Sequence, residues 1–197
     1  MLDVGCGNGT LARALQEQSF SGRYLGVDMS AGLLRQARNL TEDPSAGQFV
    51  FQQVDLAETD WHTGLPRQGY EWITCFAVLH HIPGAAHRQK IVTAMAELLA
   101  DAGSIAVSVW QWQNSPRLRK RVLPWSDAEL DAADLEERDV LLDWRAGEHP
   151  GLRYVHTFNE AELVLLAENA GLRVTESFYS DGKPGNLALY QVWQKPN

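Results

Sequence analysis

Three glycines at every second position follow a short apolar stretch at the start of the chain. They stand in the sequence Leu2-Asp3-Val4-Gly5-Cys6-Gly7-Asn8-Gly9-Thr10, and a helical pattern begins at Leu11. Glycine permits a sharp turn and lets a ligand approach main-chain N–H groups with no Cβ in the way. A helix that begins after such a turn presents N–H donors that have no partner within the helix. The stretch predicts either a ligand-binding turn or an ordinary glycine-rich turn between a strand and a helix.

Acidic side chains at three predicted strand ends help to decide between these two readings. Asp3 accompanies the glycines, and Asp28 and Asp55 end the second and third strands. A carboxylate can accept hydrogen bonds from both hydroxyls of a ribose, which suits Asp28. Asp55 would lie within reach of an adenine amino group or another polar ligand edge, although alone it could equally cap a helix or form a turn. Together the three acids favour a nucleoside-binding site.

The glycine spacing and Asp3 indicate which nucleoside ligand fits. A dinucleotide site requires Gly-x-Gly-x-x-Gly, whereas Thr10 occupies the last of those positions here, and no Gly-Lys-Ser/Thr stretch is present. Asp3 would repel a phosphate and would suit a cationic ligand. S-adenosylmethionine (SAM) carries an ammonium group and a sulfonium group and no phosphate. The residues therefore favour a methyl donor over NAD.

The hydrophobic patterns predict the elements that position these residues. Strands are expected over Met1–Val4, Arg23–Asp28, Phe49–Val54, Glu71–Val78, Ser104–Trp110, Leu172–Tyr179 and Leu187–Gln194, and helices over Leu11–Gln18, 30–40, Ala85–Ala100 and Asn159–Ala170. This alternation predicts an α/β fold: a doubly wound, Rossmann-like sheet of seven strands, mostly parallel with an antiparallel terminal strand, and helices on both faces. We expect one domain over residues 1–197, with an insertion or lid at about 111–158.

Composition and charge narrow the functional classes. The 197 residues include no run of about 18 apolar residues and no signal peptide pattern, so we expect a cytoplasmic protein without a membrane partner. Cys6 and Cys75 are isolated, and the tandem His80-His81 has no acid or cysteine at a matching short spacing, so no metal site is expected. The net charge of −8 argues against a broad nucleic-acid-binding surface.

The charge is unevenly distributed, however. Residues 126–143 carry −7, whereas residues 115–125 carry +4 and leave room for a local basic patch. The candidate nucleic-acid contacts are Arg117, Arg119, Lys120 and Arg121.

Four segments together resemble the motifs of class I SAM-dependent methyltransferases. The first motif is similar to residues 2–9, the second to Gly26-Val27-Asp28, the third to Val54-Asp55-Leu56 and the fourth to Ala77-Val78-Leu79-His80-His81-Ile82. The resemblance covers residues 1–110 and, through the terminal strand pair, the whole sheet. It implies SAM as cofactor and S-adenosylhomocysteine (SAH) as product.

The resemblance also implies roles for individual residues. Asp3, Gly5 and Gly7 would hold the methionine part of SAM, Asp28 would bind the ribose, and Asp55 with Leu56 would flank the adenine. The full set of expected cofactor-binding residues is Asp3, Gly5, Cys6, Gly7, Asn8, Gly9, Asp28, Met29, Asp55, Leu56, Phe76 and Ala77.

A narrower resemblance involves the later part of the chain. Val122-Leu123-Pro124-Trp125 and Arg153-Tyr154-Val155-His156-Thr157-Phe158 are similar to segments of the methyltransferases that esterify the 5-carboxymethyl group of the tRNA wobble uridine, and of their bacterial relatives. That group often reads Arg-Tyr-Tyr-His, whereas Val155 replaces the second tyrosine here. The acidic segment 126–143 is also not a feature of tRNA binding.

Methyl transfer from a sulfonium needs alignment of the acceptor and exclusion of water. If the acceptor is a carboxylate, no base is required, and Arg153 could position it by a bidentate contact near Tyr154 and His156. If the acceptor is a hydroxyl or amine, His81 could act as the general base, although a histidine there could also simply pack at a strand end. We therefore take His81, Arg153, Tyr154 and His156 as the candidate catalytic residues.

Three hypotheses follow for the function. The first is a tRNA-modifying methyltransferase that uses the basic patch as phosphate contacts. The second is a methyltransferase for small-molecule O- or N-acceptors whose insertion is an acidic lid. The third is a non-catalytic SAM-binding domain that serves a partner subunit. The third hypothesis is motivated by the first predicted strand, which begins at residue 1, whereas such folds commonly bring a helix over the cofactor from before that strand, so that the cradle could lack this cover.

Overall fold

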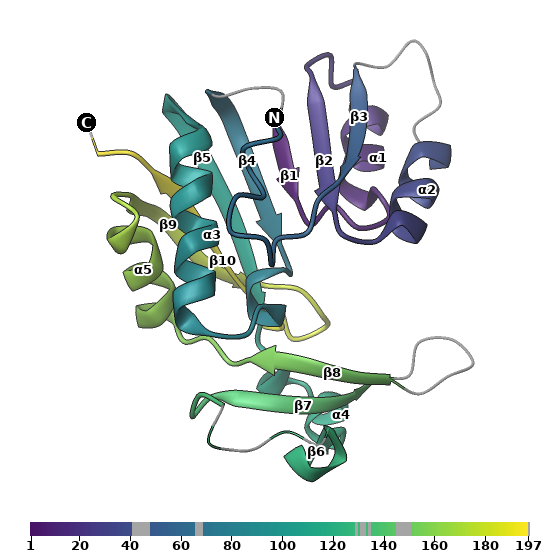
Figure 1. Ribbon diagram of the computed structural model, residues 1–197, viewed down its shortest axis with the longest axis vertical. Helices are drawn as coiled ribbons and strands as arrows, with labels where there is room; N and C mark the ends of the chain where they lie inside the picture. Colours follow the sequence, from purple (N-terminus) through teal and green to yellow (C-terminus); the bar gives the residue numbers. More distant parts are fainter. Residues whose placement is uncertain are drawn as a thin grey trace.

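A seven-stranded sheet with the order β3-β2-β1-β4-β5-β10-β9 runs through the computed structural model (Figure 1). The structure describes residues 1–40, 48–65, 69–128, 130, 133, 135–144 and 151–196. The strands are β1 (Leu2–Val4), β2 (Tyr24–Asp28), β3 (Phe49–Gln53), β4 (Tyr70–Phe76), β5 (Leu99–Trp110), β9 (Arg173–Ser180) and β10 (Ala188–Gln194). Neighbours from β3 to β5 pair in parallel, and β10 is antiparallel to both β5 and β9. This confirms the predicted fold class.

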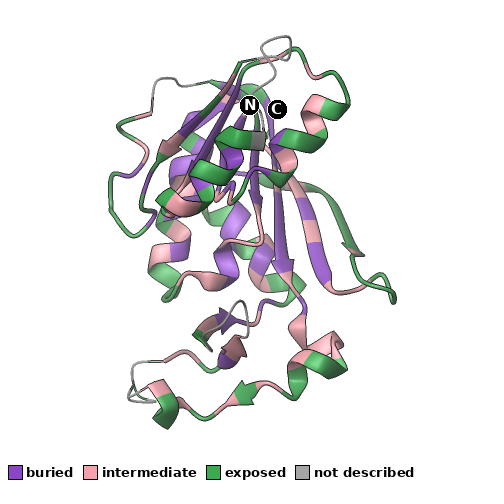
Figure 2. Ribbon diagram, turned by 90° about the vertical axis from the view of Figure 1, so that its right-hand side faces the viewer, coloured by how far each residue is buried: buried purple, intermediate pink, exposed green. Residues whose placement is uncertain are grey.

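Helices cover the sheet through two separate apolar clusters. One cluster includes residues of α3 (Ala85–Leu98) and α5 (Glu160–Asn169), and the other includes residues of α1 (Thr10–Glu17) and α2 (Ala31–Leu40). In Figure 1, α3 and α5 lie on the near side of the sheet and α1 lies behind it. Figure 2 shows that the central strands of this sheet are largely buried, whereas the edge strand β9 is exposed. The carboxyl ends of the parallel strands are thereby left as the edge at which ligands of such sheets bind.

The junction between α3 and β5 differs from the expectation. We expected the helix to reach Ala100 and the strand to begin at Ser104, but α3 ends at Leu98 and β5 begins at Leu99. The pairing with β4 shifts register between Tyr70 and Trp72, which accommodates the extra residues in the longer strand. Gly103 lies at this irregularity, where a Cβ would approach the carbonyl oxygen of Tyr70 to 2.8 Å.

The segment without a clear sequence pattern forms a second, antiparallel sheet. It contains β6 (Val122–Leu123), β7 (Asp139–Trp144) and β8 (Gly151–His156), together with the short elements η2 (Trp112–Asn114), α4 (Pro116–Arg119) and η3 (Trp125–Ala128). This small sheet lies beside the carboxyl ends of the large sheet (Figure 1), next to η1 (Leu79–His81). Glu129, Asp131 and Asp134 of the acidic segment lie outside the described residues. No helix in the described ranges has the length and apolar character needed to cross a membrane.

Candidate active site

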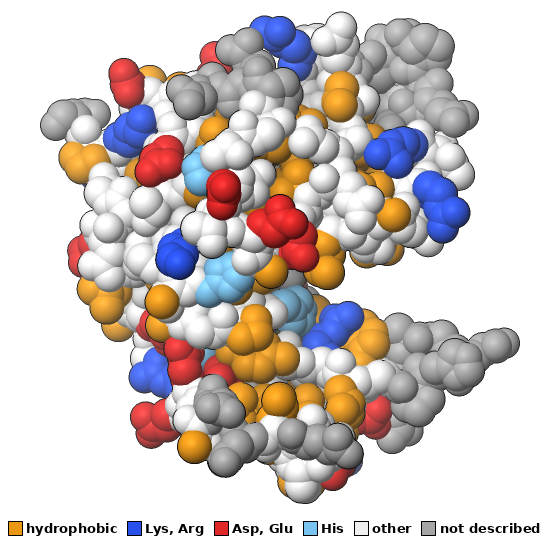
Figure 3. Space-filling model, viewed as in Figure 1, with side chains coloured by type: hydrophobic (Ala, Val, Ile, Leu, Met, Phe, Trp, Pro, Cys, Tyr) orange, Lys and Arg blue, Asp and Glu red, His pale blue; other side chains and the backbone are white. Residues whose placement is uncertain are grey.

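A cleft separates the carboxyl ends of the large sheet from the small sheet. Figure 3 shows this hollow, with histidine, cationic and apolar side chains together at its inner end. The glycine-rich loop follows β1 and η1 follows β4, so the chain brings the two most informative sequence stretches to the same edge. The candidate cofactor-binding residues and the candidate base are therefore expected to line this cleft.

The glycine-rich loop requires glycine at each of its three positions. Gly5, Gly7 and Gly9 have φ of 74°, 55° and 79°, in the left-handed region that side chains disfavour. A Cβ on Gly5 would lie 2.2 Å from Cγ2 of Val78, and one on Gly9 would lie 2.9 Å from Cβ of Ala37, whereas nothing lies within 4 Å of the corresponding position at Gly7. The loop is packed on both sides and open at its centre.

Asp28 holds this loop in place from the end of β2. Its Oδ2 accepts a hydrogen bond from the Gly7 N–H at 3.0 Å, and its Oδ1 accepts one from the Ser30 N–H at 2.8 Å. The side chain is half-buried, and each carboxylate oxygen has a further lone pair. Asp28 can thus fix the loop and still accept hydroxyl groups of a ligand.

Asp3 is placed differently from the expectation. It is 3% exposed, and its two carboxylate oxygens accept hydrogen bonds from the hydroxyls of Tyr24 and Thr74. Burial raises the pKa of Asp3, although the two hydrogen bonds act in the opposite direction. The carboxylate faces the interior, so direct contact with the methionine part of a cofactor is corrected to a role in joining β1 with β2 and β4.

The other expected cofactor residues lie in the loop after β1 and at or just after the ends of β2, β3 and β4. Asp55 is exposed and its Oδ1 accepts from the Ala57 N–H at 2.8 Å, which forms a turn after β3. Ala77 has φ of 57°, a strained value for alanine, and its N–H contacts both the carbonyl and the hydroxyl of Ser108. The remaining members differ in burial: Cys6 and Leu56 are buried, Phe76 is half-buried, and Asn8 and Met29 are exposed.

His81 is fixed at the junction of the two sheets. Its Nδ1 lies 3.0 Å from the carbonyl oxygen of Tyr154. Because a carbonyl can only accept, Nδ1 carries the proton and Nε2 keeps a lone pair. Burial, with a smaller contribution from the charge of Arg153, lowers the pKa of His81 to about 4. His81 is therefore neutral at physiological pH and has the tautomer that a general base requires.

His80 is a packing residue beneath this site. It is completely buried, and its Nδ1 accepts a hydrogen bond from the Trp110 N–H at 3.3 Å. The proton must then be on Nε2, which has no partner within the described part of the chain. Burial lowers the pKa of His80 well below its usual value. Its ring centroid lies 4.2 Å from that of His81, so it supports the imidazole from below.

Arg153 of β8 stacks on two tryptophans at the same junction. Its guanidinium carbon lies 3.3 Å from the ring centroid of Trp144 and 5.6 Å from that of Trp110. Burial lowers the pKa of Arg153. Trp110 is shared, because the His81 ring also contacts it edge-on at 5.1 Å. The structure thus brings His81 and Arg153, which the sequence offered as alternatives for different acceptors, to the same junction.

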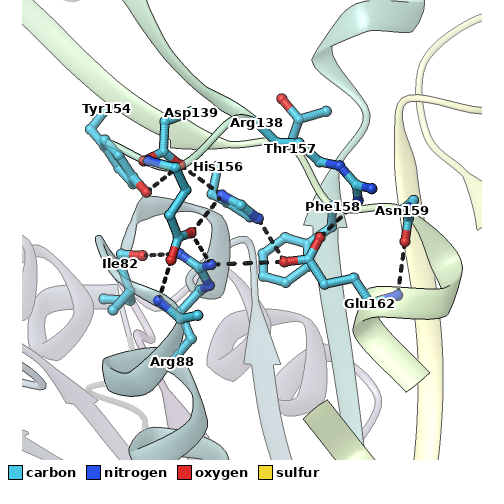
Figure 4. A network of polar contacts seen from close by, with 12 residues as sticks. Ile82, Arg88, Arg138, Asp139, Tyr154, His156, Thr157, Phe158, Asn159 and Glu162 are labelled. Atoms are coloured by element: carbon cyan, nitrogen blue, oxygen red, sulfur yellow. Dashed lines mark hydrogen bonds and ion pairs between the residues drawn. The ribbon is translucent and has the colours of Figure 1, made fainter. Parts of the chain in front are cut away.

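Tyr154 and His156 belong instead to a polar network behind the cleft (Figure 4). Oδ1 of Asp139 accepts from the Tyr154 hydroxyl and from Nδ1 of His156, each at 2.7 Å, and Nε2 of His156 lies 2.7 Å from Oε1 of Glu162. Burial alone would lower the pKa of His156, but these carboxylates raise it above its usual value. Since both ring nitrogens are occupied and His156 is 3% exposed, its expected catalytic role is corrected to a structural one.

The central cation of this network was not found from the sequence. Arg88 of α3 is 1% exposed, pairs with Glu136 and lies 3.8 Å from Oε1 of Glu162. Ligand atoms of Glu136, Asp139 and His156 lie within 4.8 Å of one another, a spacing that could hold a metal ion, but the guanidinium of Arg88 already supplies a cation there. The acidic segment gave the only sequence signal, and it suggested a solvated lid.

The candidate nucleic-acid contacts lie on and after α4. Arg117, Arg119 and Lys120 are exposed and Arg121 is half-buried. Arg119 donates to the carbonyl oxygen of Gln113 at 2.7 Å. The three exposed side chains form the basic patch that the sequence predicts as a contact surface.

Sequence comparison relates the chain to methyltransferases. The sequence pattern of a family described as "Methyltransferase domain" matches residues 1–177. A "Ubiquinone biosynthesis O-methyltransferase" of Pectobacterium atrosepticum is 34% identical over 108 residues, which are 55% of this chain and 41% of that protein. A probable methyltransferase of Aspergillus luteorubrus is 27% identical over 111 residues. The chain spans about two fifths of the length of these curated relatives.

Solved structures share the fold at low sequence identity. A SAM-dependent methyltransferase of Methanosarcina mazei superposes with a TM-score of 0.71 at 20% identity, covering 98% of this chain and 91% of that one. Magnesium protoporphyrin IX methyltransferase of Synechocystis, solved with bound SAH, gives 0.65 at 15% identity, covering 99% and 73%. Taken with the family match over residues 1–177, these likenesses lead to one conclusion: the chain belongs to the methyltransferase domain family.

Proposed function

We propose that this chain is a SAM-dependent methyltransferase that transfers a methyl group to a hydroxyl oxygen of a small-molecule acceptor. The observation that carries the proposal is the state of His81, a neutral imidazole whose Nδ1–H is fixed on Tyr154 and whose Nε2 lone pair is left for an acceptor proton. The match to ubiquinone biosynthesis O-methyltransferases supports a small acceptor that is methylated at oxygen.

The residues present fit the cofactor. The loop is open at Gly7, where no atom lies within 4 Å of a built Cβ, so main chain and ligand can approach closely. Asp28 offers carboxylate lone pairs for ribose hydroxyls, and the apolar Leu56 lies at the end of β3 for a flat base. When bound, SAM supplies a methyl group on a sulfonium: the S–CH₃ bond breaks as the acceptor oxygen forms the new C–O bond, and the electron pair stays on sulfur to give SAH.

His81 would take the hydroxyl proton as the oxygen attacks. Transfer of that proton to Nε2 leaves a protonated imidazole that Tyr154 continues to orient through Nδ1. The small sheet would cover the cleft and exclude water, since β8 provides both the Tyr154 carbonyl and Arg153.

A tRNA acceptor has weaker support. It rests on the similarity of residues 153–158 to the tRNA wobble-uridine group and on the exposed basic residues of α4. The named O-methyltransferase relatives favour a small acceptor instead. In addition, Glu136 and Asp139 of the acidic segment pair inside the protein, so part of that segment contributes to folding.

The test combines cofactor binding with an acceptor comparison. We expect the purified chain to bind SAH in calorimetry and to transfer labelled methyl groups from SAM to a catechol, but not to tRNA as judged by nucleoside mass spectrometry. His81→Asn is the decisive variant, because the asparagine amide can still donate to Tyr154 while the base is removed. Glu71→Ala, an exposed change in β4, is the control. Binding without transfer to any acceptor would favour a non-catalytic SAM-binding domain.

A further inference from the structure

Among the residues that the structure describes, Arg153 forms no salt bridge. Its guanidinium stacks on Trp144 at 3.3 Å, and within the described ranges no carboxylate or carbonyl accepts a hydrogen bond from it. The N–H donors of a guanidinium lie in its own plane, so stacking on one face leaves them directed sideways. The stack thus fixes the orientation of the donors and leaves them available for a bidentate partner.

The cation and the base share their supports. Trp110 contacts both the guanidinium of Arg153, at 5.6 Å, and the ring of His81, at 5.1 Å. Tyr154, the next residue in β8, holds Nδ1 of His81 through its carbonyl oxygen. Figure 3 shows cationic and histidine side chains next to each other at the inner end of the cleft. A ligand that reaches His81 is therefore also within the neighbourhood of Arg153.

An anion at this position would remove two costs that are present without it. Burial disfavours the charge of Arg153, and that charge in turn helps to lower the pKa of His81 to about 4, which makes the imidazole a weak base. A carboxylate paired with Arg153 would stabilise the guanidinium and reduce its effect on His81. A neutral side chain would serve equally well if the position had only to pack between two tryptophans.

We propose that Arg153, held by Trp144 and Trp110, binds a carboxylate of the acceptor, so that the substrate class is a hydroxylated aromatic carboxylate methylated at its hydroxyl beside His81. Trp110 and Trp144, whose stacked rings hold Arg153, make the surroundings of this cation aromatic, which suits an aromatic acceptor. The carboxylate is bound and remains free in the product, while the hydroxyl proton goes to His81 and the methyl group goes to the hydroxyl oxygen. This inference rests on the proposed function, because it names the acceptor of the same site.

The experiment compares two probes of nearly the same shape, a charged carboxylate and a neutral carboxamide. 3,4-Dihydroxybenzoate and 3,4-dihydroxybenzamide are titrated by calorimetry into the SAH-bound protein. We expect the carboxylate to bind at least about tenfold more tightly, because a donor fork built for a carboxylate rejects the neutral analogue. In Arg153→Met the ratio of the two affinities should fall to about one, and in Arg153→Lys part of the preference should return.

Controls separate this inference from folding and from the proposed function. Arg173→Met, an exposed change in β9, should keep the preference, and SAH affinity and thermal stability should be alike in all variants. If the unmodified protein does not bind SAH, the proposed function itself is contradicted. An equal affinity for both probes, no binding of either to the SAH complex, or an ester rather than an ether as product would overturn the assigned acceptor class.

Discussion

Nδ1 of His81 donates a hydrogen bond to the carbonyl oxygen of Tyr154 at 3.0 Å. This bond connects η1, which follows β4 of the large sheet, to β8 of the small sheet. Tyr154 also donates its hydroxyl to Asp139 at 2.7 Å. One residue therefore links the base in the cleft to the buried network behind it. The orientation of the imidazole depends on how the small sheet is seated, and the following predictions test both ends of this connection.

His81→Asn should lower the rate of methyl transfer to a hydroxyl acceptor by about 10²-fold or more, because general-base catalysis is lost. SAH affinity should not change, since the amide keeps the contact with Tyr154. In the unmodified protein the pKa of His81 is about 4, below its unfolded value, so its base form persists to acidic pH. The value of kcat/KM, which reports the pKa of the base in the free enzyme, should therefore fall only near pH 4. A rate equal to that of the unmodified protein would contradict the role of His81.

Asp28→Ala should weaken SAM binding by about 1.5–3 kcal/mol, because a charged hydrogen-bonding partner is removed. The variant loses both the contact with the Gly7 N–H and an acceptor for the ribose. Calorimetry measures the change, with Glu71→Ala as the matched loss of an exposed acid. Unchanged affinity in Asp28→Ala would contradict the position of the cofactor.

Gly5→Ala and Gly7→Ala should have different consequences. At Gly5 the added Cβ meets Val78 at 2.2 Å and the positive φ adds about 1 kcal/mol, so the variant should be markedly less stable in urea unfolding. At Gly7 the Cβ meets nothing, and only the cost of the positive φ applies to stability. Gly7→Ala should instead weaken SAM binding, since the methyl group enters the open side of the loop. Equal effects of the two variants on stability would argue against this geometry.

Arg88→Met should destabilise the fold by about 3 kcal/mol, because a buried cation is removed from among Glu136 and Glu162. Urea unfolding measures this loss. The exposed Arg173→Met is the control and should change stability by no more than about 0.5 kcal/mol. A similar, small effect of both variants would show that the network contributes little to folding.

The contribution of His156 to stability should decrease as pH rises. Its pKa in the folded protein is raised above the unfolded value, so the folded state binds the proton more strongly. The resulting stabilisation is fully present below the unfolded pKa, about 6.5, and is lost as pH rises through the folded pKa. The difference in unfolding free energy between the unmodified protein and His156→Gln should therefore be larger at pH 6 than at pH 9. A difference that grows with pH would contradict an imidazolium held by Asp139 and Glu162.

The sequence by itself determined the large sheet and the edge of that sheet to which the candidate site residues are brought. Glycine spacing reports local backbone conformation, and all three glycines of the loop adopt the left-handed region. Parallel strands bring their carboxyl ends to one edge, so Asp28, Asp55 and His81 could be placed together from their positions in the chain. The fold and the placement of these residues could be predicted because each depends on neighbours in the sequence or on a rule of sheet topology, while their roles in binding stay predictions.

Only the tertiary structure decided the roles of Asp3, His156 and Arg88. In the sequence, Asp3 has the position of a ligand-binding acid. In the structure, its carboxylate accepts a hydrogen bond inside the sheet from Thr74, which is 71 residues away. Arg88 pairs with Glu136, which is 48 residues away along the chain. Glu136 belongs to a segment whose sequence has no strand pattern. The small sheet forms because β7 and β8 pair with each other and β8 contacts η1 through the bond between His81 and the Tyr154 carbonyl. Which side chains meet across such distances is fixed by packing, and no periodicity within one segment records it.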